Sequence, residues 1–342
     1  MKEIDFELLK SFLGNKLDLD SQEIEIRPLS GGFSNLTYLI KTPSEKFALR
    51  RPPFGYKIST AHDMGRESKV LEALRRASYT KSPKPILFYK EDDILGAPFF
   101  IMEFVEGTIL RNRLPSSGII PTGETFQLLS KRSIDCLLEL HQLDLEKSGL
   151  GLLGKPEGYV QRQVSGWTER YQRAQTDQIP AMEKSAKWLL ENIPAKENKG
   201  FIHNDFKYDN LVLKSDDLAE IKAVLDWEMA TVGDPLMDLG TSLAYWAQAD
   251  DPEILKMFNL THLPGNFTRQ EVIEYYSKHS NLDLQNILFY YVFGLFKVAV
   301  IAQQIYKRFK LGQTNDPKFG ALIEVVKAAA MKAEKSILSE KI

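Results

Sequence analysis

An aspartate and an asparagine five residues apart stand out in the stretch HNDFKYDN at 203–210. Downstream, the apolar run AVLDWE at 223–228 carries a further acid, Asp226. Transfer of a phosphoryl group to an alcohol needs a carboxylate that accepts the hydroxyl proton. It also needs oxygen ligands for Mg²⁺, which binds few protein groups beside the substrate phosphates. Asp205, Asn210 and Asp226 supply such a set, so the pattern indicates phosphoryl transfer.

Other polar residues around this stretch have simpler interpretations. His203 stands alone beside a predicted strand, where a histidine is usually a structural hydrogen-bonding group. Asn204 tolerates the left-handed backbone conformation better than most residues. Asp209 is expected to be a surface charge. It is also the nearest alternative to Asp205 as the carboxylate that accepts the hydroxyl proton. Asp234 precedes Pro235, so it is expected to begin a turn or to cap the next helix.

The elements before residue 107 are expected to be mainly short strands. A strand, a tight Gly-Gly turn and a second strand are predicted over 29–40, and a further strand over 46–51 stops at Pro52. Apolar residues at helical spacing predict a helix over 63–77. A strand is predicted over 99–105, before Gly107.

The rest of the chain is expected to be mostly helical. Short strands are predicted over 201–214 and 221–227, on either side of a polar turn. The periodicity predicts helices over 126–143, 160–175, 180–191, 237–249, 269–279, 284–309 and 318–338. We therefore expect an α+β protein with a nucleotide-binding lobe at 1–106 and a catalytic and substrate-binding lobe at 107–342.

Composition excludes several classes of protein. The 342 residues carry a net charge of −2, whereas a nucleic-acid-binding protein usually shows a basic excess. One cysteine, Cys136, excludes a disulfide within the chain, and the charged N-terminus shows no secretory signal. The apolar run 287–306 is interrupted by Lys297, so a buried core helix is expected rather than a membrane span. We expect a cytoplasmic protein without a nucleic-acid or membrane partner, and the oligomeric state stays open.

Three motifs together resemble a known family. The pattern HxDxxxxN followed by Asp226 resembles the catalytic loop and metal aspartate of protein-kinase-like folds. The segment GDPLMDLG at 233–240 is similar to the signature of the aminoglycoside phosphotransferase and choline kinase family. The segment LRRPP at 49–53 resembles the phosphotransferase domain fused to some acyl-CoA dehydrogenases. The resemblance spans roughly residues 25–310 and implies a bilobal kinase-like fold, with a small β-rich N-lobe and a larger, mostly helical C-lobe.

The resemblance also implies which residues bind ATP. In the family a glycine loop covers the phosphates, a cation on a strand contacts them, and a hinge strand contacts adenine. The cation here is arginine where lysine is usual, and arginine still binds phosphate. Without the resemblance, the glycine pair is an ordinary hairpin turn and the hinge an ordinary strand. The implied residues are Gly31, Gly32, Phe33 and Ser34 in the loop, Arg50 with its partner Glu67, and Met102, Glu103 and Val105 in the hinge.

By the same resemblance, Asp205 is the general base and Lys207 contacts the γ-phosphate. Asn210 and Asp226 are the implied Mg²⁺ ligands. His203 and Asp238 are implied to brace the loop backbone.

The acceptor is a small molecule with a hydroxyl group, and its identity stays open. Residues 287–311 contain four cations and no acid, and a basic and aromatic group lies at 162–173. This mixture favours an anionic or carboxylate-bearing alcohol over a polycationic aminoglycoside. The motifs are also compatible with a nucleotide-binding pseudokinase or a protein kinase, and they do not distinguish ATP from GTP. The candidate acceptor residues are Arg162, Trp167, Arg170 and Tyr171.

Overall fold

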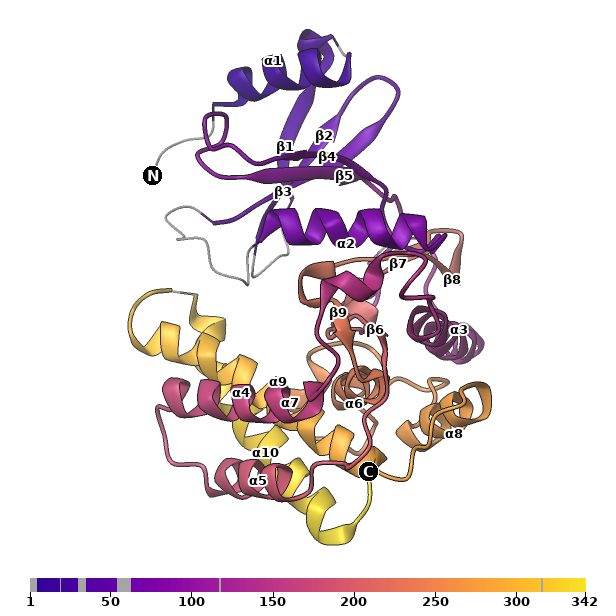
Figure 1. Ribbon diagram of the computed structural model, residues 1–342, viewed down its shortest axis with the longest axis vertical. Coiled ribbons are helices and arrows are strands. Elements are labelled where there is room, and N and C mark those ends of the chain that lie inside the picture. Colours follow the sequence, from indigo (N-terminus) through magenta and orange to yellow (C-terminus); the bar gives the residue numbers. More distant parts are fainter. Residues whose placement is uncertain (1–4, 19, 30–34, 54–62, 117, 315) are drawn as a thin grey trace. The chain divides into compact units, whose positions relative to one another are not determined.

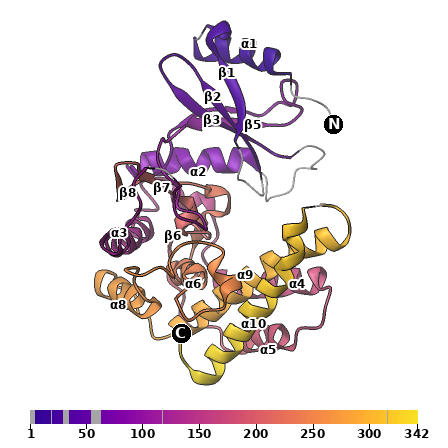
Figure 2. The same ribbon diagram turned by 180° about the vertical axis from the view of Figure 1, so that it is seen from behind.

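The computed structural model describes the chain except for residues 1–4, 19, 30–34, 54–62, 117 and 315 (Figure 1). The chain divides into two compact units. Unit 1 is rich in strands and unit 2 in helices (Figures 1 and 2), as expected for the α+β class. Unit 1 comprises Met1–Glu106, Lys147–Gly149 and Ala223–Ala230, and unit 2 comprises Gly107–Glu146, Leu150–Lys222 and Thr231–Ile342.

Unit 1 contains an antiparallel sheet with the strand order β1-β2-β3-β5-β4. The central strand β3 is buried along most of its length and ends before Pro52, which cannot donate to a strand ladder. The strands are β1 (Glu25–Leu29), β2 (Leu36–Lys41), β3 (Lys46–Arg51), β4 (Pro85–Tyr89) and β5 (Phe99–Glu103).

Two helices cover opposite faces of this sheet (Figure 1). Helix α1 (Phe6–Leu17) buries Leu9 and Leu13 against strand residues such as Leu49. Helix α2 (Met64–Arg76) begins after its N-cap, Asp63, and buries an apolar stripe next to β4 and β5. The face of β3 that carries Arg50 is thereby enclosed on the side of α2.

Unit 2 is built around one long helix, α9 (Ile287–Lys310), which packs on α6, α10, α4 and α5. By length and composition α9 would be able to cross a membrane, but 78% of its most apolar window is buried inside the protein. It is therefore a core helix, as the sequence predicted. The other helices are α3 (Gly123–His141), α4 (Tyr159–Ala174), α5 (Pro180–Glu191), α6 (Pro235–Tyr245), α7 (Glu253–Lys256), α8 (Arg269–His279) and α10 (Leu322–Ser339).

Two small sheets complete unit 2 and frame the polar stretch of interest. Strand β6 (Gly200–Ile202) pairs with β9 (Thr231–Gly233), and β7 (Leu211–Lys214) pairs with β8 (Asp217–Val224). The prediction of strand over 201–214 is therefore confirmed only at its two ends, because a loop occupies the middle. Sequence periodicity missed α1 and β4, whose apolar faces are short.

Candidate active site

The loop between β6 and β7 brings three predicted residues of unit 2 together. Lys207 Nζ lies 2.9 Å from Asp205 Oδ2. A single 3₁₀ turn, Tyr208–Asn210, returns the chain so that Asn210 Nδ2 lies 2.8 Å from the Asp205 carbonyl and 3.1 Å from its Oδ2. Asn210, five residues after Asp205, is thus brought back to Asp205 by the loop that ends in this turn.

Electrostatics keep Lys207 charged. Burial opposes the charge, but the Asp205 carboxylate outweighs burial and raises the pKa of Lys207. Asp209, predicted as a surface charge, is instead half-buried, and burial raises its pKa.

The backbone of the loop is held by Asp238, which is fully buried in α6. Its two oxygens accept hydrogen bonds from the backbone N–H of His203, at 2.6 Å, and of Asn204, at 2.8 Å. Burial would raise the pKa of Asp238, but His141 lowers it, so Asp238 stays ionised. The predicted structural role of Asp238 is confirmed, and so is the predicted helix cap, since the Asp234 side chain accepts from Leu236 N–H.

Asn204 adopts the left-handed conformation, with φ +68°. Its carbonyl accepts a hydrogen bond of 2.6 Å from Lys297, and its side chain bonds the Tyr159 hydroxyl. The His203 ring accepts a hydrogen bond from the Asp205 N–H, a structural arrangement. Three elements therefore fix the peptide that precedes Asp205: α4, α6 and α9.

Lys297 was predicted only as a basic residue of the long helix, and the structure gives it a specific place. Its side chain is 2% exposed, and its ammonium lies 5.7 Å from the centre of the Trp167 ring. Burial lowers the pKa of Lys297 to about 8. The position of this lysine within the apolar run 287–306 is the sequence signal from which a buried contact could have been inferred.

Unit 1 carries an ionic cluster around Arg50, which is 8% exposed. The guanidinium bonds Glu67 in α2 and lies 3.1 Å from Asp226 Oδ1 and 3.6 Å from Glu228 Oε2. Burial disfavours the charge of Arg50, but the three acids outweigh it and raise its pKa. The expected pairing of Arg50 with Glu67 is present. Glu228 was not predicted as a site residue.

Arg51 points to the other face of β3, as the alternation of a strand predicts. Its guanidinium donates to the carbonyl oxygens of Leu95, at 2.9 Å, and Pro52, at 3.0 Å. Arg50 is therefore the arginine of this pair that faces the acidic cluster.

The predicted hinge lies at the end of β5. Met102 is buried, Glu103 ends the strand, and Val105 follows beyond the ladder. The predicted phosphate loop, Gly31 to Ser34, lies outside the described residues.

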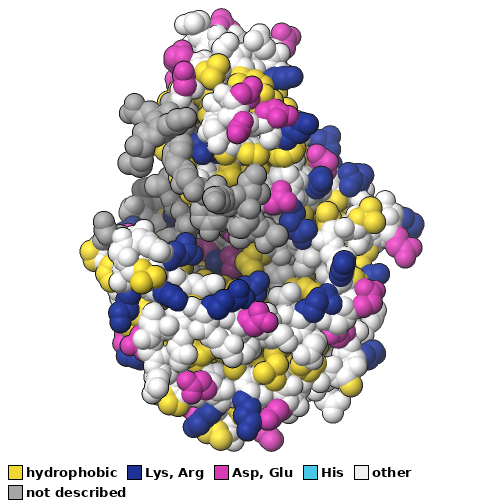
Figure 3. All heavy atoms as spheres, turned by 60° about the vertical axis from the view of Figure 1, so that its left-hand side comes forward, with side chains coloured by type: hydrophobic (Ala, Val, Ile, Leu, Met, Phe, Trp, Pro, Cys, Tyr) yellow, Lys and Arg dark blue, Asp and Glu magenta, His cyan; other side chains and the backbone are white. Residues whose placement is uncertain are grey.

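Among the candidate acceptor residues, Arg170 lies beside Trp167, whereas Tyr171 and Arg162 have structural contacts. The Arg170 guanidinium lies 4.7 Å from the centre of the Trp167 ring, on the helix that packs against α9. Tyr171 is buried in the helix packing. Arg162 donates to the backbone carbonyls of Glu157 and Lys155, so it closes the start of its own helix. Lys and Arg side chains gather on one face of unit 2 (Figure 3).

The donor atoms suit magnesium better than a transition metal. The amide nitrogen of Asn210 makes both of the hydrogen bonds described above, so its amide oxygen is the atom of this side chain that would bind a cation. The Asp226 side chain is 35% exposed. Carboxylate and amide oxygens are ligands that Mg²⁺ prefers. Within the described parts of the chain, no group of three or more His, Cys, Asp or Glu is placed to hold a metal ion. A magnesium ion would therefore depend on phosphate oxygens and water as well.

Comparison with known proteins gives matches along most of the chain. A model of the phosphotransferase enzyme family matches residues 25–275. Acyl-CoA dehydrogenase family member 11 of Rattus norvegicus is 35% identical over 288 residues, which are 83% of this chain and 36% of that protein. Family member 10 of Mus musculus is 34% identical over 313 residues, 90% of this chain and 28% of that protein. The chain therefore spans well under half the length of each of these relatives.

Solved structures confirm the predicted kinase-like fold. A protein of Ralstonia eutropha JMP134, provisionally assigned as an aminoglycoside phosphotransferase, has a TM-score of 0.81 and 25% identity, with 98% of this chain and 99% of that chain covered. Choline kinase from Cryptosporidium parvum Iowa II has a TM-score of 0.68 and 12% identity, with 98% and 97% covered.

Proposed function

The chain belongs to the phosphotransferase enzyme family, and on that premise we propose that it transfers the γ-phosphoryl group of ATP to a hydroxyl of a small molecule. The observation that carries this proposal is the loop in which Lys207 and Asn210 both contact the Asp205 carboxylate. Such a carboxylate is oriented by two donors and has 17% of its side chain exposed, so that a substrate hydroxyl can reach it.

Asp205 acts as the general base. Its carboxylate takes the proton of the acceptor hydroxyl while that oxygen attacks the γ-phosphorus. The bond between the γ-phosphorus and the β,γ-bridging oxygen breaks, and ADP leaves with the electron pair. The Lys207 ammonium offsets charge on the transferred group. Asp238 and Lys297 hold the loop backbone at His203 and Asn204, so the base needs little reorganisation during the reaction.

The nucleotide is bound by the unit 1 residues around Arg50. Arginine offers planar, bidentate donors to phosphate oxygens, and Glu67 orients it. Bound Mg²⁺ would neutralise phosphate charge, and the Asn210 oxygen and the Asp226 carboxylate are the groups we propose to hold it. Met102, Glu103 and Val105 are proposed to contact the base, with Gly31, Gly32, Phe33 and Ser34 over the phosphates.

We further propose that the acceptor is an anionic or carboxylate-bearing alcohol. The Trp167 ring already has two cations close to it, Arg170 and Lys297. A ring occupied in this way is poorly suited to a quaternary ammonium or aminoglycoside amine, which would meet like charges instead. Guanidinium and ammonium groups instead favour a carboxylate or a phosphate. The Lys and Arg side chains drawn on unit 2 in Figure 3, with Asp and Glu side chains among them, would attract the same anionic groups.

One observation favours a second candidate, a nucleotide-binding pseudokinase. Arg50 replaces the usual lysine, and it is paired with Asp226, the proposed metal ligand. If Asp226 stayed paired with Arg50 when nucleotide was bound, its carboxylate would not be available to Mg²⁺, and the chain would bind nucleotide without transferring phosphate.

Acceptor-dependent ADP release tests the proposal. The enzyme is incubated with Mg²⁺-ATP or Mg²⁺-GTP and a panel of hydroxy acids, phosphorylated alcohols, choline and aminoglycosides. We expect release with ATP and an anionic alcohol, and its loss in Asp205→Asn. Nucleotide binding by calorimetry with no release for any acceptor would instead establish the pseudokinase. Release with choline or an aminoglycoside alone would overturn the anionic acceptor.

A further inference from the structure

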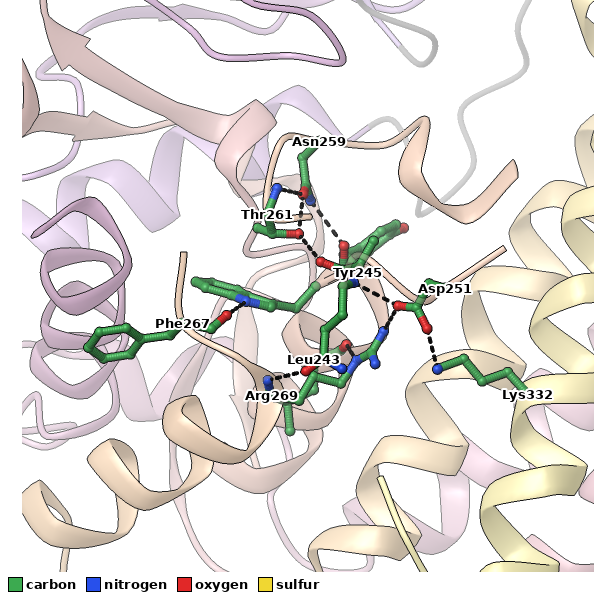
Figure 4. Close-up of polar contacts among 11 residues, drawn as sticks. Leu243, Tyr245, Asp251, Asn259, Thr261, Phe267, Arg269 and Lys332 are labelled. Atoms are coloured by element: carbon green, nitrogen blue, oxygen red, sulfur yellow. Dashed lines mark hydrogen bonds and ion pairs between the residues drawn. The ribbon is translucent and has the colours of Figure 1, made fainter. Parts of the chain in front are cut away.

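The turn that follows α6 is fixed by buried polar contacts that the proposed mechanism does not use (Figure 4). Asp251, which is 4% exposed, bonds both Arg269 of α8 and Lys332 of α10. The backbone N–H of Gln248 donates to the same carboxylate at 2.8 Å. Burial would raise the pKa of Asp251, but Arg269 and Lys332 outweigh burial and lower that pKa, so the carboxylate is ionised. If one partner moved away, a buried charge would be left uncompensated, which is energetically costly. The three side chains therefore stay in place and anchor the turn.

Side chains from later in the sequence donate hydrogen bonds to three backbone carbonyls of the same turn. Arg269 Nε donates to the Leu243 carbonyl at 3.2 Å, and Asn259 Nδ2 donates to the Tyr245 carbonyl at 3.1 Å. Thr261 Oγ1 donates to the Ala247 carbonyl at 2.9 Å. Buried carbonyls satisfied by side chains do not rearrange cheaply. Side chains from outside the turn therefore hold it at three of its carbonyls (Figure 4).

Tyr245, at the start of this anchored turn, places its ring against Lys207, a proposed catalytic residue. The Lys207 ammonium lies 4.6 Å from the centre of its ring. Burial raises the pKa of Tyr245, Lys207 opposes that rise and Asp205 adds to it. The tyrosine is 5% exposed, so its contact with Lys207 is largely desolvated, where a cation–π contact is strongest.

We infer that Tyr245 is a positioning residue for phosphoryl transfer: its ring orients the Lys207 ammonium, and the Asp251 cluster fixes the ring. This inference rests on the proposed function, in which Lys207 offsets charge on the transferred group. Tyr245 acts through Lys207 and needs no contact with substrate. Ion pairing with Asp205 alone would leave the lysine side chain free to rotate about its flexible stem, and the ring removes that freedom.

The first test measures the contact without any activity. The rate at which an amine-acylating reagent labels Lys207 is followed by mass spectrometry in the full chain, for wild type, Tyr245→Phe and Tyr245→Leu. We expect Tyr245→Leu to raise labelling about 2- to 30-fold, the range of a cation–π contact, and Tyr245→Phe to resemble wild type. Tyr38→Leu removes a buried tyrosine of unit 1 and is the control for general loosening. Equal labelling in wild type and Tyr245→Leu would overturn the inference.

The second test separates positioning from stability. For the acceptor that gives turnover, we expect kcat of Tyr245→Leu to fall by a similar factor with KM for ATP nearly unchanged, and Tyr245→Phe to restore kcat. Lys332→Met, which removes one partner of Asp251, should lower kcat in the same direction by less. Equal losses of kcat in the Phe and Leu variants would overturn the role of the ring. An unchanged kcat in Lys332→Met would overturn the role of the Asp251 cluster.

The two tests fail independently. If wild type releases no ADP with any acceptor, the proposed function fails, and with it the catalytic part of the inference. Labelling still decides whether Tyr245 orients Lys207. If wild type is active and labelling changes while kcat in Tyr245→Leu does not, the proposed function stands and the positioning role is overturned.

Discussion

At the scale of single residues, the carboxylate of Asp205 and the backbone of its loop are held by different side chains. Its carboxylate contacts Lys207 and Asn210, whereas the loop backbone is held by Asp238 and Lys297. Removing the negative charge of Asp205 therefore leaves the supports of the loop in place.

Asp205→Asn tests the proposed base. The change keeps the shape and removes the basicity, so kcat should fall about 10²–10⁴-fold, the range of a general base. ATP affinity should stay nearly constant, because the proposed nucleotide contacts come from unit 1 and the metal. Steady-state kinetics and calorimetric binding of ATP measure both quantities. Lost ATP affinity with an unchanged kcat would make Asp205 a ligand and direct the search for the base to Asp209.

Arg50→Ala tests the phosphate contact. Loss of a charge-assisted hydrogen bond should weaken ATP binding by about 1.5–3 kcal/mol. Arg50→Lys keeps the charge and should retain part of the affinity. The Kd for ATP is measured by calorimetry on protein whose fold is checked by circular dichroism, because Arg50→Ala also leaves Glu67 buried without its partner. An unchanged Kd in both variants would remove Arg50 from the nucleotide site.

Lys297→Met tests the cost of a buried ammonium. The pKa of Lys297 is lowered to about 8 from 10.5, so between these values the unfolded chain binds more protons than the folded one. The free energy of unfolding of wild type, relative to Lys297→Met, should therefore rise with pH, by about 1–2 kcal/mol from pH 7.5 to 9.5. Urea unfolding at several pH values measures this difference. Lys187→Met, at a lysine with 76% of its side chain exposed, should show no such trend. A parallel pH dependence in wild type and Lys297→Met would contradict the burial penalty.

At the scale of elements, the approach of α6 to α9 explains why the family signature ends in glycine here. A Cβ on Gly294 of α9 would lie 2.3 Å from the Gly240 carbonyl oxygen, and one on Gly240 would lie 2.2 Å from the Tyr290 carbonyl oxygen. Both contacts are with backbone, which cannot move without shifting a helix. Through this contact α6 carries Asp238, and α9 carries Lys297, to the same loop.

Gly294→Ala should therefore destabilise unit 2 by about 1–3 kcal/mol, as overpacking does. The matched control is Gly166→Ala in α4, where a Cβ would meet only the end of the Arg170 side chain at 3.4 Å. That control should be neutral or slightly stabilising, because alanine is the better helix former. Urea unfolding gives both free energies. Equal values for the two variants would show that the helices have room to separate.

At the scale of the whole molecule, the chain path is not a simple sequence of two domains. Residues Ala223–Ala230, which include Asp226 and Glu228, belong to unit 1, although the residues before and after them belong to unit 2. The division predicted after residue 106 rested on the change from short strands to helices, and it did not anticipate this return of the chain.

The magnesium prediction concerns Asp226, which lies in this returning segment. Removal of magnesium should abolish turnover by the proposed enzyme, and Asp226→Ala should have the same effect. The carboxylate would supply the main protein charge to the ion. ADP release is measured against Mg²⁺ concentration, with and without EDTA. Asp217→Ala, which removes an acid of β8 that pairs with Arg132, is the control and should leave the magnesium dependence unchanged. Wild-type turnover in Asp226→Ala would refute the metal assignment.

The sequence by itself determined the features that depend on neighbours along the chain. The spacing of Asp205, Lys207 and Asn210 encodes one turn, the alternation of β3 separates Arg50 from Arg51, and the apolar run of α9 marks the core helix. Each follows from local geometry, in which periods of two or 3.6 residues and the reach of a turn decide which side chains meet.

Only the tertiary structure decided which distant residues support the site. Lys297 contacts Asn204 from 93 residues away. Tyr245 meets Lys207, and Glu228 meets Arg50, through packing that no local period encodes. The anchor at Asp251 joins α8 and α10, far apart in the chain. Such contacts arise when buried charges and carbonyls must find partners wherever the fold brings them, and that condition acts only in the folded molecule.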